Sequence, residues 1–377
     1  MKIGLLLPSV YMADKYKNKI FAPKELFLNL ANGLVDRGHD VYVYCAPGTK
    51  TKAHLVEGNP ELIKQDFITP KFRGLDRITK QKNAHLISRT EYEMDLCVRA
   101  YLHGKENKID IMHSYHGDTF MSHYINRIVD LPTVYTVHDP KPRREHIEYW
   151  RIKHFRNDNY IFISKSQERH FKNFAKSVGV IYHGVDTKKF AFSEKGGSYL
   201  AFIGRYIKEK GVVEAAMAAK EAKIPLKMVG DKVYRVLSYY QTKVLPLLRK
   251  GSIEDQTFLG KSDRQVFFQN AWALLFPILW EEPFGMVMIE AMSCGTPVIA
   301  FNHGSVSEIV KDGETGFIVD PKEGVRGLVR AIKKLQSLNP QKYHLMRVAC
   351  RVHVEKNFSV AKMVDEYEEL YRKLTND

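Results

Sequence analysis

Two glutamates stand eight residues apart in the stretch EEPFGMVMIEAMSCGTPVIAF, residues 281–301, which is otherwise largely apolar. Glu282 precedes a predicted helix that begins near Phe284, and Glu290 is expected about two turns inside that helix. At roughly 100° per residue, the two side chains come within about 80° of each other around the helix axis. An elongated polar ligand at the helix start could therefore contact both carboxylates. The alternatives are a capping role for Glu282 and simple solvent exposure for Glu290.

The start of this helix also offers backbone hydrogen-bond donors. The first N–H groups of a helix have no intrahelical acceptor and suit an anion such as phosphate. Here they belong to Phe284, Gly285, Met286 and Val287.

A second loop, FIGRYIKEKG (202–211), carries two cations. Arg205 directly follows Gly204, and Lys210 directly precedes a predicted helix. Arginine binds phosphate oxygens in a bidentate manner and lysine acts as a compact point charge, so the two could hold a diphosphate. The alternative is a pair of unrelated surface cations.

The elements that must position these loops alternate between strand and helix. Strands are predicted at residues 2–8, 41–46, 132–137, 160–164, 179–182, 198–204, 226–229 and 317–320, with helices over 23–37, from 211 and over 232–249. This alternation predicts parallel sheets covered on both faces, and the second start at 198–204 predicts two doubly wound α/β domains. Ligands bind outside the carboxyl ends of such strands, which is where both loops lie.

The boundary between the two series is expected in KKFAFSEKGGS (188–198), which is polar and aperiodic. We therefore predict an N-terminal Rossmann-like domain over residues 1–190 and a C-terminal one over 191–358. The last helical pattern follows no strand, and residues 359–377 are expected to cross back onto the first domain. A length of 377 residues agrees with two domains, because single cores rarely grow beyond about 300 residues.

Metal and redox chemistry find little support in the residue pattern. His113, His116 and Asp118 come nearest to a metal-ligand grouping, but without a cysteine partner or an HExxH motif such a set is more often structural. Neither a metal nor a cofactor is predicted. The four cysteines are far apart and form no CxxC pair, which predicts a reducing, cytoplasmic location. They are Cys45, Cys97, Cys294 and Cys350.

The opening MKIGLLLPSV is expected to be a buried strand. Pro8 interrupts its apolar run, which is too short for a membrane span and lacks a small-residue cleavage pattern. No later segment reaches membrane-spanning length.

The formal net charge of +15 is concentrated in the first half of the chain. It favours an anionic partner, whether nucleic acid, an acidic membrane surface or a phosphorylated substrate, against the alternative of a solvated basic surface. The segment KPRREHIEYWRIKHFR (141–156) holds six Lys and Arg against two Glu, with apolar side chains between them. It is either a surface for an anionic acceptor or lipid headgroups, or a solvated helix that packs its aromatic side chains onto the first domain. Helical spacing places Ile147, Trp150 and His154 on one face.

Several of these motifs, in this order, resemble the retaining nucleotide-sugar glycosyltransferases of glycosyltransferase family 4. EPFGMVMIE (282–290) is similar to the family's E-x7-E pattern, and GRYIKEKG (204–211) to its diphosphate motif. SEIVKDGETGFIVDP (307–321), VIYHGVDTKKF (180–190) and TVHD (136–139) also resemble family segments. The resemblance runs over nearly the whole chain and implies the GT-B fold, with two Rossmann-like domains facing across a cleft.

The resemblance also implies a role for each site residue. Arg205 and Lys210 would hold the diphosphate of a UDP- or GDP-sugar, in place of the metal that other transferases use. Glu282 would accept hydrogen bonds from the donor sugar, and Glu290 from the ribose. The backbone N–H groups near Gly285 to Val287 would help to hold the sugar and phosphate. On the acceptor side the implied residue is His138.

Two positions depart from the family pattern. Ala22-Pro23 stands where a Gly-Gly turn is usual, and Pro23 has no N–H to offer to a phosphate. His183 stands where an asparagine is usual. The first departure puts the contribution of the loop before the first helix in doubt.

Other functions are weighed against a hexose-transferring enzyme. A catalytically silent nucleotide-sugar-binding module would share the fold, but Glu282, Arg205 and Lys210 are intact. Nucleic-acid binding is suggested by charge alone and is not predicted, because no recognised motif accompanies it. An NAD-dependent oxidoreductase lacks a GxGxxG after either first strand. The acceptor is not identified by the sequence, and an anionic acceptor with peripheral association at the inner membrane face remains a hypothesis.

Overall fold

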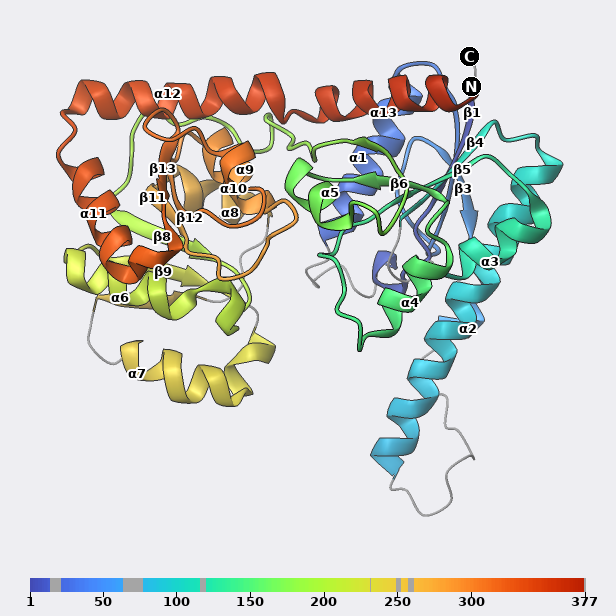
Figure 1. The fold of residues 1–377 in the computed structure, drawn as a ribbon, viewed down its shortest axis with the longest axis horizontal. Helices are drawn as coiled ribbons and strands as arrows, with labels where there is room; N and C mark the ends of the chain where they lie inside the picture. The colour runs from blue at the N-terminus through green and yellow to red at the C-terminus, as the bar shows by residue number, and fades with distance from the viewer. Residues whose placement is uncertain are drawn as a thin grey trace. The chain divides into compact units, whose positions relative to one another are not determined.

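The computed structural model describes residues 1–13, 22–63, 77–115, 120–230, 232–248, 252–256 and 261–375. The chain divides into two compact units (Figure 1). Unit 1 comprises Met1–Ile163, Phe171–Ile181 and Met363–Asp377, and unit 2 comprises Ser164–His170 and Tyr182–Lys362. The continuous part of unit 1 thus ends ahead of the polar stretch at 188–198, and the end of the last helix belongs to unit 1.

Unit 1 is built on a seven-stranded parallel sheet with the order β3-β2-β1-β4-β5-β6-β7. Its strands are β1 (Lys2–Leu6), β2 (Asp40–Cys45), β3 (His54–Glu57), β4 (Ile111–Tyr115), β5 (Thr133–Thr136), β6 (Asn159–Phe162) and β7 (Ser177–Val180). Helices connect them, namely α1 (Ala22–Asp36), α2 (Arg77–Glu106), α3 (Phe120–Val129), α4 (Ile147–His154) and α5 (Lys165–Phe171). Chain order reverses beside β1, as in a doubly wound fold.

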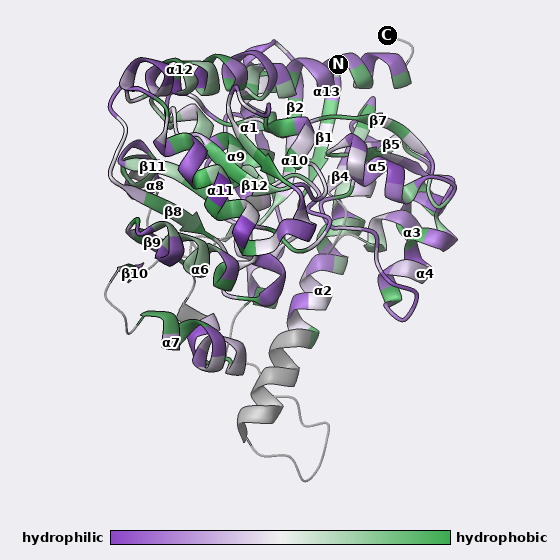
Figure 2. Cartoon of the chain, turned by 60° about the vertical axis from the view of Figure 1, so that its left-hand side comes forward, coloured by the Kyte–Doolittle hydropathy of each residue, from purple (hydrophilic) through white to green (hydrophobic). Residues whose placement is uncertain are grey.

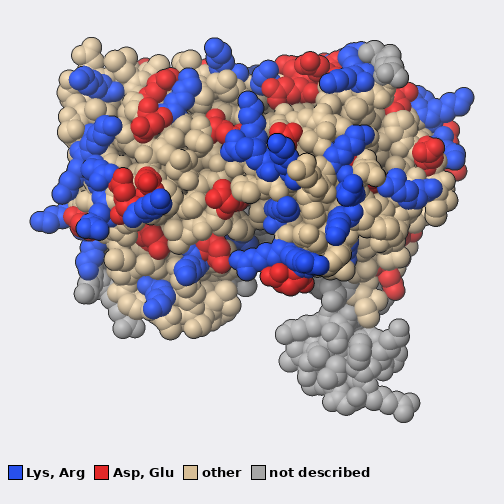
Figure 3. Space-filling view, viewed as in Figure 1, with Lys and Arg blue, Asp and Glu red and all other residues tan. Residues whose placement is uncertain are grey.

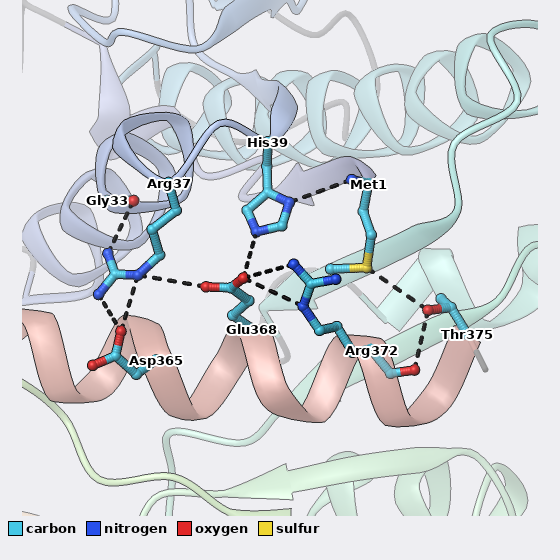
Figure 4. Close-up of polar contacts among 8 residues, drawn as sticks. All are labelled: Met1, Gly33, Arg37, His39, Asp365, Glu368, Arg372 and Thr375. Carbon is cyan, nitrogen blue, oxygen red and sulfur yellow. Dashed lines mark hydrogen bonds and ion pairs between the residues drawn. The ribbon is translucent and has the colours of Figure 1, made fainter. Parts of the chain in front are cut away.

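Helix α13 (Val360–Thr375) packs against unit 1 through buried and charged contacts. Its Tyr367 and Tyr371 are buried beside the sheet, where the Tyr371 hydroxyl lies 2.5 Å from His113 Nδ1. On its outer side Glu368 pairs with His39 at 3.1 Å, and Asp365 accepts a hydrogen bond from Arg37 Nε at 3.0 Å (Figure 4). A helix without a following strand is therefore held mainly by side-chain contacts, beside one backbone hydrogen bond from Val360 N–H to the Val185 carbonyl at its start.

Unit 2 is built on a six-stranded parallel sheet with the order β10-β9-β8-β11-β12-β13. Its strands are β8 (Tyr199–Ile203), β9 (Leu226–Val229), β10 (Ile253–Gln256), β11 (Ala271–Phe276), β12 (Val298–Phe301) and β13 (Gly316–Val319). The helices are α6 (Val212–Ala222), α7 (Leu245–Leu248), α8 (Lys261–Gln269), α9 (Met286–Ser293), α10 (Val306–Ile309), α11 (Gly324–Gln336) and α12 (Pro340–Asn357). The sheet strands are mainly hydrophobic, whereas α12 carries more hydrophilic residues (Figure 2).

The start of α5 belongs to unit 2, and a carboxylate of that unit binds its N-terminus. Glu308, on α10, accepts hydrogen bonds from the backbone N–H groups of Lys165 at 2.8 Å and Ser166 at 2.6 Å. The same carboxylate accepts a hydrogen bond from the Tyr182 hydroxyl at 2.8 Å. A helix N-terminus favours such an anion, because its first N–H groups lack intrahelical acceptors.

Each strand predicted above is present, with ends shifted by at most two residues, but the long helix predicted over 232–249 is confirmed only in part, because it is interrupted near 237. That segment contains a 3-10 turn (Lys232–Val236), a π-helical turn (Tyr240–Val244) and the short α7. Helical structure is continuous over 238–248, and its π-helical turn comes directly before Leu245 and Pro246, where the proline has no N–H for a bond one turn back. No helix among the described residues is both long enough and apolar enough to cross a membrane.

Candidate functional site

The two loops singled out in the sequence leave neighbouring strands of unit 2. The arginine and lysine follow β8, and the glutamates follow β11, which pairs with β8 in parallel register. The carboxyl ends of these strands therefore lie at the same edge of the sheet. A backbone hydrogen bond from Leu279 N–H to the Glu209 carbonyl, 2.8 Å long, joins the two loops directly.

Glu282 lies at the centre of this edge. Its Oε2 atom is 2.6 Å from the ammonium nitrogen of Lys210 and accepts a second hydrogen bond, also 2.6 Å, from the indole N–H of Trp280. The side chains of Lys210 and Glu282 are only 16% and 12% exposed, so their interaction is weakly screened by water. Both bonds go to Oε2, so Oε1 remains in position to accept a hydroxyl of a ligand.

The Trp280 indole ring lies close to both cations of the first loop, Lys210 and Arg205. The Lys210 ammonium lies 4.9 Å from the centroid of the indole ring, and the Arg205 guanidinium lies 5.9 Å from it. Arg205 is exposed to solvent. The structure thus groups Arg205, Lys210 and Glu282 around one indole ring. Sequence reasoning missed Trp280, although its place directly before the two glutamates was a usable signal.

A glycine fixes the spacing of the two loops. Gly211 has φ +66°, and a Cβ atom at this position would lie 1.8 Å from the carbonyl oxygen of Pro277. Only a residue without a side chain fits there, because both the backbone conformation and the space exclude a Cβ. Since Lys210 is its neighbour, this close approach places the Lys210 backbone beside the second loop, and the contacts with Glu282 and Trp280 then hold the ammonium group.

The adjacent acid, Glu281, has a different role from Glu282. Its carboxylate accepts a hydrogen bond from the Gly304 N–H at 2.8 Å and lies 3.2 Å from His303 Nδ1, in the loop that follows β12. Ser305 N–H in turn donates to the Glu282 carbonyl at 3.0 Å. Glu281 therefore stabilises the loop that follows β12, whereas Glu282 contacts Lys210.

Helix α9 begins at Met286, two residues later than predicted, and Gly285 is its N-cap residue at φ +84° without a side-chain cap bond. Glu282 is therefore not the cap, and that alternative is wrong. Gly285, Met286 and Val287 are partly exposed at the helix start. The Phe284 side chain is buried and contacts His183, with 5.1 Å between ring centroids.

Glu290 is buried, so the alternative of simple solvent exposure is wrong. It is the fifth residue of α9, about one turn inside the helix and not two. Its carboxylate lies 2.9 and 3.1 Å from one guanidinium nitrogen of Arg264, which comes from α8. Sequence reasoning missed Arg264. A carboxylate predicted inside an apolar helix was the available signal, because a buried charge needs a partner.

The remaining predicted site residue, His138, belongs to unit 1. It follows β5 and stacks on Tyr115, with ring centroids 4.9 Å apart and an interplanar angle of 28°. Burial lowers the pKa of His138 to about 4, so the ring is neutral at pH 7. A neutral imidazole can donate one hydrogen bond and accept another, but it carries no charge toward an anionic ligand.

The residues considered for metal binding do not form a cluster in the part of the chain that the structure describes. His113 is fully buried, its Nε2 lies 2.7 Å from the Thr136 hydroxyl, and burial lowers its pKa to about 3. His116 and Asp118 lie outside the described residues. Among the described residues, no group of three or more His, Cys, Asp or Glu side chains could hold a metal ion. All four cysteines are free and buried.

Ala22-Pro23 stands where the family usually has a Gly-Gly turn, and the structure describes the chain only from Ala22 onward at this place. Helix α1 begins at Ala22, so Pro23 occupies its first turn, where a missing N–H costs little. Residues 14–21, which precede it, lie outside the described part of the chain.

Comparison with protein families identifies the class. The model described as Glycosyltransferase Family 4 matches residues 25–189, and that described as Glycosyl transferases group 1 matches residues 185–349. The two matches together run from 25 to 349 with little overlap. The chain is therefore a glycosyltransferase.

Individual proteins agree with this class. The chain is 26% identical to an uncharacterized glycosyltransferase of Methanocaldococcus jannaschii over 317 residues, covering 81% of this chain and 83% of the relative. It is 28% identical to the N-acetyl-alpha-D-glucosaminyl L-malate synthase of Bacillus anthracis over 219 residues, covering 54% and 55% of the two chains.

Solved structures share the fold. Sucrose-phosphate synthase from Thermosynechococcus elongatus has a TM-score of 0.73 at 18% identity, with 100% of this chain and 99% of that chain covered. Anabaena HepE in complex with UDP and glucose has a TM-score of 0.69 at 18% identity, with 98% of each chain covered. The chain belongs to the glycosyltransferases of the family 4 type and has the GT-B fold, as its sequence motifs predict.

Proposed function

We propose that this glycosyltransferase moves a hexose from a UDP- or GDP-sugar to a separate acceptor, with retention of the donor's anomeric configuration and without a metal ion. The observation that carries the proposal is the placement of Lys210, Glu282 and Trp280 at one edge of the unit 2 sheet, with Glu282 Oε2 2.6 Å from both partner nitrogens. A carboxylate held in place by a cation can bind a sugar hydroxyl, while the cation remains close to the leaving group.

The roles of the cations follow from the charge that develops during transfer. Breaking the bond between the sugar and the diphosphate leaves negative charge on the phosphate oxygens, which Lys210 and Arg205 would stabilise. The N–H groups at the start of α9, around Gly285 to Val287, carry partial positive charge and would donate further hydrogen bonds to the phosphate oxygens. Lys210 is already held by Glu282 and Trp280 without a donor, so its ammonium needs little reorganisation at the reacting bond.

Glu290 would accept hydrogen bonds from the ribose hydroxyls. The guanidinium of Arg264 lies 2.9 Å from its buried carboxylate and supplies the partner that a buried acid needs. A carboxylate held in one position suits a vicinal diol, because its oxygens can accept hydrogen bonds from both hydroxyls. The UDP-glucose complex of Anabaena HepE, a protein of the same fold, supports a nucleotide-sugar donor here.

Retention would follow from attack by the acceptor on the face of the sugar that the diphosphate leaves, with a phosphate oxygen helping to take the acceptor's proton. Glu282 is held by Lys210 and the Trp280 indole, which favours a binding role over that of a covalent nucleophile. His138, which is neutral at pH 7, would line the acceptor side by donating or accepting one hydrogen bond. We further propose an anionic acceptor, reached at the inner face of a membrane.

The test is donor hydrolysis by the purified full-length chain with UDP-, GDP- and ADP-linked hexoses, followed through the released nucleoside diphosphate. We expect release with a UDP- or GDP-sugar, unchanged by EDTA, and loss of release in Glu282→Gln. The matched control is Glu281→Gln, which keeps an oxygen for the Gly304 N–H and should retain turnover. A chain that binds these donors but releases no diphosphate, with or without candidate acceptors, would be the silent binding module.

The stereochemical part is tested separately. Proton NMR of the first product formed distinguishes retention from inversion by the coupling constant of the anomeric proton. An inverted product would refute retention while leaving the donor assignment intact.

A further inference from the structure

Helix α4 turns two apolar side chains toward solvent. Ile147 is 57% exposed and Trp150 is 44% exposed, although both are large and apolar. The helix is held to unit 1 by its other side, where Ile152 is buried and the Tyr149 ring packs on Phe174 at 4.7 Å. The face that the sequence groups together, Ile147 with Trp150, is therefore the outward face. The prediction that α4 packs all its aromatic side chains inward is wrong for Trp150.

Helix α3 extends this surface. Figures 1 and 2 show α3 and α4 side by side. The Tyr124 ring stacks near His154 of α4 with a centroid distance of 6.1 Å, and the Arg151 guanidinium lies 3.8 Å from the Phe120 ring centroid. Ile128, one turn beyond Tyr124, is 83% exposed. We call the exposed side chains of the two helices the α3–α4 surface; its apolar members are Tyr124, Ile128, Ile147 and Trp150.

Cations surround these apolar side chains. The Arg144 guanidinium lies 5.6 Å from the Trp150 ring centroid, and the Lys153 ammonium lies 5.2 Å from it. The indole N–H donates to the Arg144 carbonyl at 2.9 Å. Figure 3 shows that Lys and Arg also gather on the visible face of unit 1 near α4. The exposed cations of the loop and helix are Lys141, Arg143, Arg144, Lys153 and Arg156.

The acidic groups nearby offset little of this charge. Glu148 is engaged by Arg151 at 3.4 Å, and Asp158 is buried between His123 and Arg127, at 2.7 and 2.5 Å. Glu145 is exposed. The α3–α4 surface therefore combines a net positive charge with protruding aliphatic and aromatic side chains. Basic side chains attract anionic headgroups, and tryptophan and isoleucine enter the headgroup and acyl boundary.

We propose that the α3–α4 surface docks on an anionic phospholipid bilayer, with Trp150, Ile147 and Ile128 inserted at the level of the headgroups. Arg144 and Lys153 would stay in the headgroup layer, because long basic side chains keep their charge in the polar region. One part of this proposal rests on the proposed function: the bilayer would present the acceptor close to the loop that follows His138. Bilayer binding itself requires no transfer.

The experiment uses the full chain and vesicles of phosphatidylcholine with 0 to 50% phosphatidylglycerol. Flotation measures the bound fraction at low and high salt, and bromine-labelled lipid tests whether tryptophan enters the bilayer. Arg144→Glu with Lys153→Glu should lower partitioning at least tenfold. The matched control reverses two exposed cations on one face of α11, Arg326→Glu with Lys333→Glu, and should leave partitioning within twofold. Ile128→Ser with Ile147→Ser tests the apolar part.

Each outcome decides the proposal. Binding that rises with phosphatidylglycerol, is lost in the α4 charge variant and quenches tryptophan in the wild type but less in Trp150→Phe supports it. Equal binding of the α4 and α11 variants overturns it. Tight binding to the soluble polyanion heparin without quenching by labelled lipid also overturns it, and would indicate a soluble acidic partner. Donor hydrolysis without vesicles should be unchanged in all these variants, so failure of the proposed function is seen independently.

Discussion

The proposed part of Glu282 in catalysis predicts that Glu282→Gln separates turnover from product affinity. Glutamine keeps the shape of the side chain but cannot hold Lys210 by charge, and it accepts weaker hydrogen bonds from a sugar hydroxyl. A hydrogen bond to a charged group contributes about 1.5–3 kcal/mol. Loss of the sugar contact, together with loosening of the lysine, should therefore lower kcat on the order of a hundredfold.

Affinity for the nucleoside diphosphate should change in the opposite direction. Glu282 Oε2 lies 2.6 Å from the Lys210 ammonium, so a phosphate oxygen on the other side of that nitrogen would be about 5 Å from the carboxylate. At an effective dielectric constant between 20 and 80, the repulsion between these two anions is about 1–3 kcal/mol. Its removal in Glu282→Gln should tighten binding several-fold, although the same substitution slows turnover.

The assay pairs steady-state release of nucleoside diphosphate with calorimetric titration of UDP or GDP, and circular dichroism confirms that each variant is folded. Arg205→Ala is the contrasting variant, because a phosphate contact made in both ground and transition states should lower turnover and affinity together. Glu281→Gln is the control for a carboxylate of the same loop. Near-wild-type turnover in Glu282→Gln, or a loss of affinity equal to its loss of turnover, would refute the reasoning.

Three further outcomes are expected. Transfer should survive EDTA. If EDTA abolished activity and magnesium or manganese restored it, the proposal that Arg205 and Lys210 replace a metal ion would be wrong. Gly211→Ala should lower the unfolding free energy by more than the roughly 1–2 kcal/mol that the left-handed conformation costs an L-residue, because its Cβ would lie 1.8 Å from the Pro277 carbonyl oxygen. Gly313→Ala, with φ +76° and open space around it, should cost only that backbone term. Equal losses of unfolding free energy for the two variants in urea would contradict the predicted clash. Burial lowers the pKa of His113 to about 3, so below about pH 6.5 the unfolded chain binds a proton that the folded chain does not. As the pH is lowered from about 6.5 to 3, this group should reduce the free energy of unfolding by up to roughly 1.4 kcal/mol per pH unit. In urea unfolding, His113→Gln should lose less stability over the same pH range than the wild type.

The sequence by itself determined the two series of strands and helices and the loops that carry the site. Apolar runs of strand length are local signals, and parallel strands must place their exits at one edge of a sheet. The arginine, lysine and glutamate of two distant loops could therefore be expected together before any contact was known. The first half was less readable. Strand β4, which reads IMHSY, carries a buried histidine and serine that hide its apolar character, and β3 is short and half-exposed.

Tertiary structure decided which of the charged residues are partners. Glu281 and Glu282 are adjacent and chemically identical, yet one braces the loop after β12 and the other meets Lys210. Arg264 reaches Glu290 only because α8 packs on α9. Such pairs depend on strand order, register and helix packing, which the local pattern does not encode.

The outward face of α4 was decided in the same way. Spacing alone grouped Ile147 with Trp150, but it could not say whether that face or the face of Ile152 would be buried. The neighbours of a helix settle this, because a side chain is removed from water only where another element packs against it. Here Ile152 and Tyr149 pack on the side that holds Phe174, and Trp150 is left to solvent beside two cations.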